Sequence, residues 1–281
     1  MGYYEFNIEV PDESKDAIIN MAYESGSLGV VETQNYLLIY FPDHRGIKKL
    51  IDDFASFKTI LKDSGLLHDF SFSYVYLSER DWNESWKKKF QPIDVGEDLS
   101  IIPPWEISRF GRINLLIDPG MAFGTGHHIT TKTCLELIER LTRESLKERF
   151  LDVGTGTGIL AIGAAKLGFR EVVGVDIDPL AIDAAKRNVN LNGLTNMTIL
   201  EGTISVAKGA YDVIAANLMS EILIAIAPDI SSRLKNKGIV LLSGMIIGQE
   251  DEVIAAMEKE GLMFRERYYD DIRWVSLVLT R

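Results

Sequence analysis

The sequence predicts a large α/β domain with a mostly parallel sheet, preceded by a smaller α+β domain. From residue 113 onward, short apolar runs alternate with amphipathic helical patterns, which is the order of βαβ units. One apolar run passes directly into a glycine-rich turn and a helix, at 151–166. Residues 1–78 show a different order of patterns, βαββαβ. The chain is therefore expected to fold as two domains of different class.

The smaller domain is expected to be ferredoxin-like, because βαββαβ is the order of that split arrangement. Its first and last strand patterns alternate apolar with polar residues, at 4–10 and 70–76, and two short strands are expected between them, at 28–33 and 36–41. Its helix patterns each have one apolar face, at 11–25 and 46–64. We expect this domain to recognise the substrate.

The charge of the smaller domain favours a protein partner over RNA. Residues 1–78 hold 12 acidic and 6 basic residues, so over half of the net charge of −11 lies there. RNA-binding domains of this fold usually show a basic or aromatic stacking surface. The aromatic residues of the last strand could stack on bases, but they alternate as core residues do.

Residues 79–112 are expected to connect the two domains. Trp82, Trp86 and Phe90 recur every four residues, so a short helix would place them on one aromatic edge. We favour the interpretation that this edge docks one domain on the other, and not that it stacks on a ligand. A strand is expected at 99–102.

The stretch 151–158 gives the clearest indication of function. It ends an apolar strand with glycines at positions 154, 156 and 158, and an apolar helix follows. Glycines let the backbone approach a ligand that any Cβ would block, and the helix N-terminus offers free N–H groups. The dinucleotide fingerprint fails, because Ile159 stands where its third glycine belongs. The spacing instead resembles the first motif of class I S-adenosylmethionine-dependent methyltransferases.

The next strand pattern ends in a carboxylate that fits the same type of ligand. Asp176 lies 22 residues after Gly154, close to the ~20 expected for a ribose-binding acid. A carboxylate there can accept hydrogen bonds from both ribose hydroxyls. The alternative role is helix capping, for which Asp178 is better placed because Pro179 suits the first helical position.

Asn217 follows a later apolar strand pattern, at 211–216. Ligands in such sheets bind at the carboxyl ends of the strands. Asn217 is therefore a candidate group at the reacting centre. The alternative is a turn residue before a helix that begins at Ser220.

Residues 118–131 form a second glycine-rich loop, which contains His127 and His128. The threonines at its end can cap a helix expected at 132–141. A loop with so many special residues is usually functional. No metal is expected, because adjacent histidines rarely suffice and neither cysteine nor acid lies at ligand spacing.

The loop 120–131, the connector 81–92 and the glycine turn together resemble the PrmA family, the methyltransferases of ribosomal protein eleven of the large subunit. The resemblance covers almost the whole chain and is weakest in residues 1–78. Two small departures are His128-Ile129, where many members have His-Pro, and the residues after Asn217, which are Leu-Met-Ser in place of Ile-Leu-Ala.

The resemblance implies a Rossmann-like class I methyltransferase domain with a seven-stranded sheet over residues 113–281. It implies S-adenosylmethionine as the cofactor and the amines of ribosomal protein eleven, at its N-terminus and its lysines, as the substrate. We expect Phe123 and Asn217 at the reacting centre. The residues expected to bind the cofactor are Thr131, Gly154, Gly156, Asp176 and Asn217.

Composition sets the remaining expectations. A hydrophobic fraction of 46% and a single cysteine, Cys134, are typical of a soluble protein of a reducing cytoplasm. The N-terminus has no signal-peptide pattern, and no apolar run reaches the ~18 residues of a membrane helix. The acidic balance disfavours general attraction to nucleic acid. We expect a monomer without membrane or sequence-specific nucleic-acid partners.

Two other functions stay open. A nucleic-acid base methyltransferase usually carries prolines and an aromatic residue after the Asn or Asp, to stack a flipped base. Asn217 is followed by neither, which disfavours that alternative. A protein-binding module with a vestigial cofactor pocket is the non-enzymatic alternative, and the intact glycines and Asp176 disfavour it.

Overall fold

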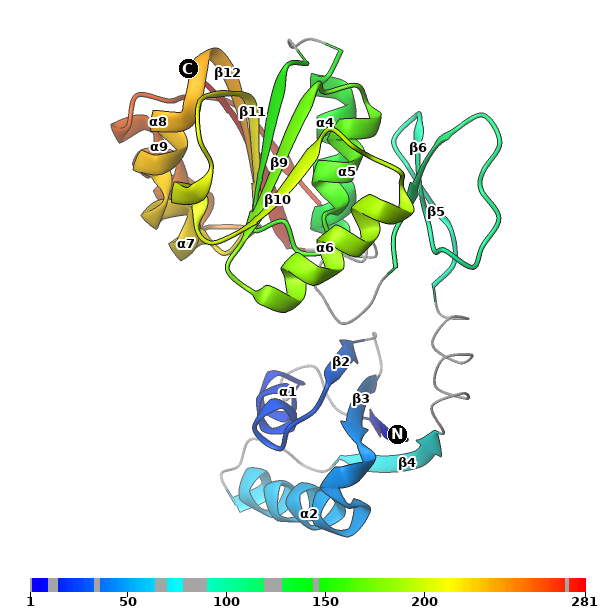
Figure 1. The fold of residues 1–281 in the computed structure, drawn as a ribbon. Coiled ribbons are helices and arrows are strands. Elements are labelled where there is room, and N and C mark those ends of the chain that lie inside the picture. Colours follow the sequence, from blue (N-terminus) through cyan, green and yellow to red (C-terminus); the bar gives the residue numbers. More distant parts are fainter. Residues whose placement is uncertain are drawn as a thin grey trace. The chain divides into compact units, whose positions relative to one another are not determined.

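The computed structural model describes residues 2–9, 15–32, 36–63, 70–77, 90–118, 128–143, 147–270 and 273–281. It divides the chain into two compact units, Met1–Phe90 and Gln91–Arg281 (Figure 1). The division falls inside the segment expected as a connector. Trp82 and Trp86 of the expected aromatic edge lie outside the described residues. The strand expected at 99–102 is confirmed, and it belongs to the larger unit.

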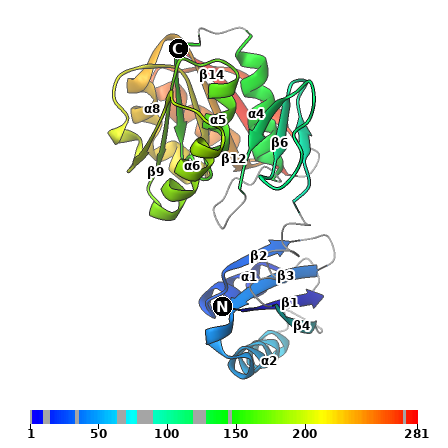
Figure 2. The same cartoon turned by 45° about the vertical axis from the view of Figure 1, so that its right-hand side comes forward.

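The smaller unit has one antiparallel sheet, in the order β2-β3-β1-β4 (Figure 2). Its strands are β1 (Tyr3–Glu9), β2 (Gly29–Glu32), β3 (Tyr36–Pro42) and β4 (Ser71–Leu77). Its helices are α1 (Lys15–Glu24) and α2 (Ile47–Asp63), and a short 3-10 helix, η2, spans Asp43–Arg45. This is the strand order of the split βαβ arrangement, so the ferredoxin-like prediction is confirmed.

The alternating pattern of this sheet puts one face against both helices. Phe6 of β1 and Ile39 of β3 are fully buried in a core that they share with Phe54 of α2. The aromatic residues of β4 follow the expected core pattern only in part. Tyr74 and Tyr76 are 44% and 53% exposed, and they lie on β4, which is an edge strand of this sheet.

The larger unit has a seven-stranded sheet in the order β10-β9-β8-β11-β12-β14-β13. Its strands are β8 (Arg149–Val153), β9 (Glu171–Asp176), β10 (Met197–Glu201), β11 (Tyr211–Asn217), β12 (Leu234–Ile246), β13 (Met263–Tyr269) and β14 (Trp274–Thr280). The five strands from β10 to β12 are parallel, and β14 is antiparallel to both of its neighbours. The predicted seven-stranded α/β sheet is confirmed.

Helices cover both faces of this sheet (Figure 1). One face carries α4 (Ile129–Leu141), α5 (Ile159–Lys166) and α6 (Pro179–Leu191), and the other carries α7 (Ser220–Ala225), α8 (Ala227–Arg233) and α9 (Glu250–Lys259). Between β10 and β11 lies a 3-10 helix, η3 (Ile204–Val206). The helix expected at 222–234 is therefore two short helices, because Pro228 opens the second one. β9, β11 and β14 read as near-continuous apolar runs since both of their faces are buried.

A third, small sheet belongs to the larger unit. It contains β5 (Ile93–Val95), β6 (Leu99–Ile102) and β7 (Ile113–Leu116), in that order. The strand expected at 113–117 thus forms, but it pairs in parallel with β6 and not with the large sheet.

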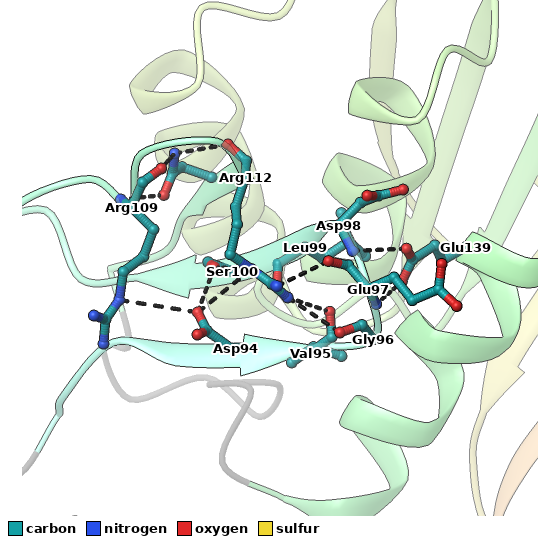
Figure 3. Close-up of polar contacts among 11 residues, drawn as sticks. Asp94, Val95, Gly96, Glu97, Asp98, Leu99, Ser100, Arg109, Arg112 and Glu139 are labelled. Carbon is teal, nitrogen blue, oxygen red and sulfur yellow. Dashed lines mark hydrogen bonds and ion pairs between the residues drawn. The ribbon is translucent and has the colours of Figure 1, made fainter.

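Polar contacts fix the β5–β6 hairpin from two sides (Figure 3). The Arg112 guanidinium donates to the carbonyls of Val95, Gly96, Glu97 and Leu99 at 2.6–3.2 Å. From α4, the Glu139 carboxylate accepts hydrogen bonds from the backbone N–H groups of Glu97 at 3.0 Å and Asp98 at 2.8 Å. Burial raises the pKa of Glu139. The hairpin is therefore tied to the helix whose N-terminus carries site residues.

Replacing Arg112 with methionine is expected to lower the free energy of unfolding by about 2 kcal/mol, because several hairpin carbonyls lose a charged donor. Urea unfolding followed by tryptophan fluorescence measures this. Arg170→Met is the matched control, since the side chain of Arg170 is 81% exposed and pairs with the exposed carboxylate of Glu148, so its loss should matter less. Equal losses in the two variants would contradict the role given to Arg112.

Candidate active site

A cavity of about 590 Å³ lies at the carboxyl ends of the parallel strands. Its volume falls within the ~300–1,000 Å³ typical of small-molecule sites. Four residues singled out from the sequence line it, namely Gly154, Gly156, Asp176 and Asn217. They come from the ends of three different strands, β8, β9 and β11, which the sheet order brings side by side.

The glycine turn after β8 has the backbone that its sequence requires. Gly154, Gly156 and Gly158 have φ values of +71°, +55° and +83°, in the left-handed region that other residues rarely adopt. Gly158 then serves as the N-cap of α5. A Cβ at Gly154 would come within 2.5 Å of the Leu218 side chain. The turn therefore presents bare backbone to the cavity.

Asp176 ties the end of β9 to this turn. Its Oδ2 accepts a hydrogen bond from the Gly156 N–H at 2.9 Å, and its Oδ1 accepts one from the Asp178 N–H at 3.0 Å. Each carboxylate oxygen keeps a further lone pair for a ligand hydroxyl. Asp178 caps α6 ahead of Pro179, as predicted, by accepting from the Leu180 N–H at 2.9 Å.

Asp152 is a buried acid beneath the turn that sequence reasoning missed. It is 1% exposed, and its Oδ2 accepts hydrogen bonds from the Thr155 hydroxyl at 2.7 Å and the Ala161 N–H at 3.2 Å. Its Oδ1 has no partner among the described residues. Burial raises its pKa to about 7. An acid within an otherwise apolar strand, two residues before Gly154, was the available sequence signal.

Replacing Asp152 with asparagine is expected to change stability, relative to the parent protein, more favourably at pH 8 than at pH 5. The unfolded chain releases the Asp152 proton near pH 4, whereas the folded chain holds it to about pH 7. The parent therefore loses stability as the pH rises through this window, and asparagine does not titrate. The variant-minus-parent difference in unfolding free energy should grow by about 3 kcal/mol from pH 5 to pH 8. Urea titrations of cofactor-free protein measure this, and a pH-independent difference would contradict it.

Asn217 ends β11 beside the first turn of α4. Its Nδ2 donates to the Thr130 hydroxyl at 3.1 Å, and that hydroxyl lies 2.7 Å from Nδ1 of His128. Thr130, His128 and Asn217 all line the cavity. The His128 ring packs edge-on against Trp274, with centroids 4.9 Å apart. Burial and the nearby Arg273 lower the pKa of His128, so its neutral form is favoured.

The prediction that threonines cap this helix is wrong. α4 begins at Ile129, and His128 is its N-cap, with Nδ1 accepting from the Thr130 N–H at 3.3 Å. A ring nitrogen takes the place of a hydroxyl at the cap, so both threonines lie inside the first turn.

The structure places Thr130, and not Thr131, on the wall of the cavity. Thr131 is 1% exposed, and its hydroxyl has no partner among the described residues. Neighbouring residues of a helix point about 100° apart, so the Thr131 side chain points in a different direction from that of Thr130. The cofactor role expected of Thr131 stays a prediction. Phe123 lies outside the described residues, and its role at the reacting centre stays a prediction.

Three further observations concern the cysteine, metal ions and membrane helices. Cys134 is fully buried, and burial raises the pKa of its thiol, as expected of a structural cysteine. Within the ranges that the structure describes, no group of three or more His, Cys, Asp or Glu side chains could hold a metal ion. In the same ranges, no helix is long and apolar enough to cross a membrane.

Residues 2–281 match the family model described as Ribosomal protein L11 methyltransferase (PrmA). The chain belongs to the PrmA family. It is 42% identical over 192 residues to the ribosomal protein L11 methyltransferase of Symbiobacterium thermophilum; the match covers 68% of this chain and 62% of that protein. It is 32% identical over 299 residues to the protein of the same name from Thermoanaerobacter pseudethanolicus. That match covers 95% of this chain and 96% of that protein.

A crystal structure agrees with this membership. The ribosomal protein L11 methylase of Lactobacillus delbrueckii subsp. bulgaricus aligns with a TM-score of 0.63 and 31% identity, covering 68% of this chain and 99% of that one. The PrmA chain therefore has the class I methyltransferase fold and is an S-adenosylmethionine-dependent enzyme. The fold class, enzyme class and cofactor predicted from the sequence are confirmed.

Proposed function

We propose that this PrmA protein methylates amines of ribosomal protein L11 in the cytoplasm, at the N-terminal α-amine and at lysine ε-amines. The main support for the proposal is the orientation of the Asn217 side-chain amide at the cavity wall. Its Nδ2 is engaged by Thr130, so Oδ1 is left as the acceptor for an amine N–H. The relatives' shared name supports L11 as the substrate.

The cavity fits the methyl donor. Gly154 and Gly156 leave room for its methionine part, because neither carries a Cβ. Asp176 would accept hydrogen bonds from the ribose hydroxyls, and Ile177 and Ile204 supply apolar wall for the adenine. Bound there, the sulfonium supplies an electrophilic methyl group.

The residues of the chain then orient the acceptor. Asn217 would hold the amine by an N–H, which turns its lone pair toward the methyl group, and such positioning is a large part of the rate enhancement. A protonated amine has no lone pair, so it loses a proton before attack. Water at the open cavity can accept that proton.

The smaller unit is proposed to bind the L11 protein. Residues 1–78 carry twice as many acidic as basic side chains, which complements a basic ribosomal protein and steers its approach. The same charge would repel RNA. We propose that the enzyme acts as a monomer.

The test offers purified enzyme and S-adenosylmethionine to purified L11, free tRNA and rRNA in separate reactions, with mass spectrometry after each. Methyl groups on L11 amines are expected. Methylation of RNA alone would overturn the proposal in favour of a base methyltransferase. Failure to bind labelled S-adenosylmethionine would instead favour a protein-binding module.

A further inference from the structure

We infer that His128 and Thr130 are positioning residues, which hold the Asn217 side-chain amide with its oxygen toward the methyl acceptor. The inference rests on the proposed function in one respect, that the acceptor is an amine. It assigns a role in acceptor recognition to two cavity-lining residues at the N-terminus of α4.

The direction of the hydrogen bonds follows from one backbone group. The Thr130 N–H can only donate, and its acceptor is Nδ1 of His128, at 3.3 Å. Nδ1 is therefore unprotonated, and the Thr130 hydroxyl, 2.7 Å away, must donate to it as well. That hydroxyl has no second hydrogen, so it can only accept from Asn217. The atom of Asn217 that faces Thr130 must be Nδ2, at 3.1 Å.

The amide oxygen consequently lies on the other side, next to Gly244. A Cβ built at Gly244 would come 2.9 Å from Asn217 Oδ1 and 2.7 Å from the Leu218 carbonyl oxygen. The glycine leaves this space open, and Gly244 lines the same cavity as Asn217. Oδ1 is thus presented where a ligand N–H could reach it.

The ring that fixes this polarity is itself held in place. His128 contacts Trp274 of β14 edge-on, and the charged groups that affect its titration are Arg273 and Asp270, from the segment before β14. Burial and Arg273 favour the neutral ring that the hydrogen-bond chain requires. Two elements far apart in sequence, α4 and β14, meet at this ring.

The orientation matters because the two ends of an amide treat an amine in opposite ways. Oδ1 accepts an amine N–H and leaves the nitrogen lone pair free to attack. Nδ2 would donate to that lone pair and compete with methyl transfer. Without the Thr130 hydroxyl, the Asn217 amide can rotate. The rate of methyl transfer should then fall while cofactor binding persists.

The kinetic test compares Thr130→Val, which keeps the shape and removes the hydroxyl, with Thr130→Ser, which keeps the hydroxyl. With L11 as substrate, Thr130→Val should lower kcat by about 10- to 100-fold. Thr130 lines the same cavity as Asp176, so the Kd of S-adenosylhomocysteine is measured separately and should rise by a smaller factor than the one by which kcat falls. Thr130→Ser should restore kcat to within about three-fold of the parent. A parental kcat in Thr130→Val, or equal losses in both variants, would overturn the inference.

A second readout does not depend on activity. The ¹⁵N resonances of the His128 ring, assigned with a His128→Phe variant, report which nitrogen carries the proton. An unprotonated Nδ1 near pH 7 is expected, and an Nδ1–H tautomer would overturn the inference. A parent enzyme that leaves L11 unmethylated while Nδ1 is unprotonated would contradict the proposed function and leave the positioning role supported.

Discussion

Replacing Asn217 with alanine is expected to lower kcat for L11 methylation by about 100-fold. In the proposed function the amide oxygen is the acceptor that orients the substrate amine, and misplacing a reacting group by about 1 Å costs a factor of this size. Asn217 also lines the donor cavity, so a smaller, several-fold loss of cofactor affinity should accompany the change. Single-turnover rates at saturating cofactor separate the two effects.

The matched control for this prediction is Asn190→Ala. Asn190 is an exposed residue of α6. Its replacement therefore removes the same kind of side chain at a position without a role at the cavity. Its kcat should equal that of the parent. If Asn217→Ala loses affinity for the cofactor but keeps its single-turnover rate, then Asn217 is only a cofactor contact.

Sequence reasoning located the parts of the site that lie at strand ends. Gly154, Asp176 and Asn217 each directly follow an apolar run, and in a parallel sheet all such ends point to one edge. The position of a residue along the chain then suffices to place it. The glycine spacing also indicated the type of ligand, because it does not match the dinucleotide fingerprint and resembles the first motif of class I methyltransferases.

The cavity-lining residues that sequence reasoning did not single out depend on angles and on long-range pairing, and the cofactor role expected of Thr131 stays a prediction. The choice between Thr130 and Thr131 needs the phase of α4, which the His128 cap sets and no periodicity shows. Trp274 reaches the cavity because β14 is inserted between β12 and β13. Alternation of β and α patterns gives no information about that insertion.

Strand 113–116 illustrates the same limit for the fold. Its apolar pattern was recognised, but its partner is β6, in a sheet separate from the large one. Short apolar runs show that a strand forms and do not show which edge it joins. Arg112 and Glu139 hold the β5–β6 hairpin that supplies the partner strand (Figure 3). These contacts exist only in the folded chain, so the sequence pattern does not show them.

Replacing Asp176 with alanine is expected to weaken S-adenosylmethionine binding by about 1–3 kcal/mol, which is the usual cost of losing hydrogen bonds to a charged group. This loss would have two sources, one proposed and one visible in the structure. The carboxylate would no longer accept from the ribose hydroxyls, and the Gly156 and Asp178 N–H groups would lose their acceptor. Isothermal titration calorimetry measures the total.

A comparison of binding with stability separates these two sources. Loss of the backbone contacts lowers the stability of the cofactor-free protein, whereas loss of the ribose contacts affects only the complex. Asp183→Ala, at an exposed position of α6, should change neither quantity. If Asp176→Ala lowers the unfolding free energy without cofactor but leaves the Kd unchanged, Asp176 only braces the glycine turn, and the ribose has another acceptor.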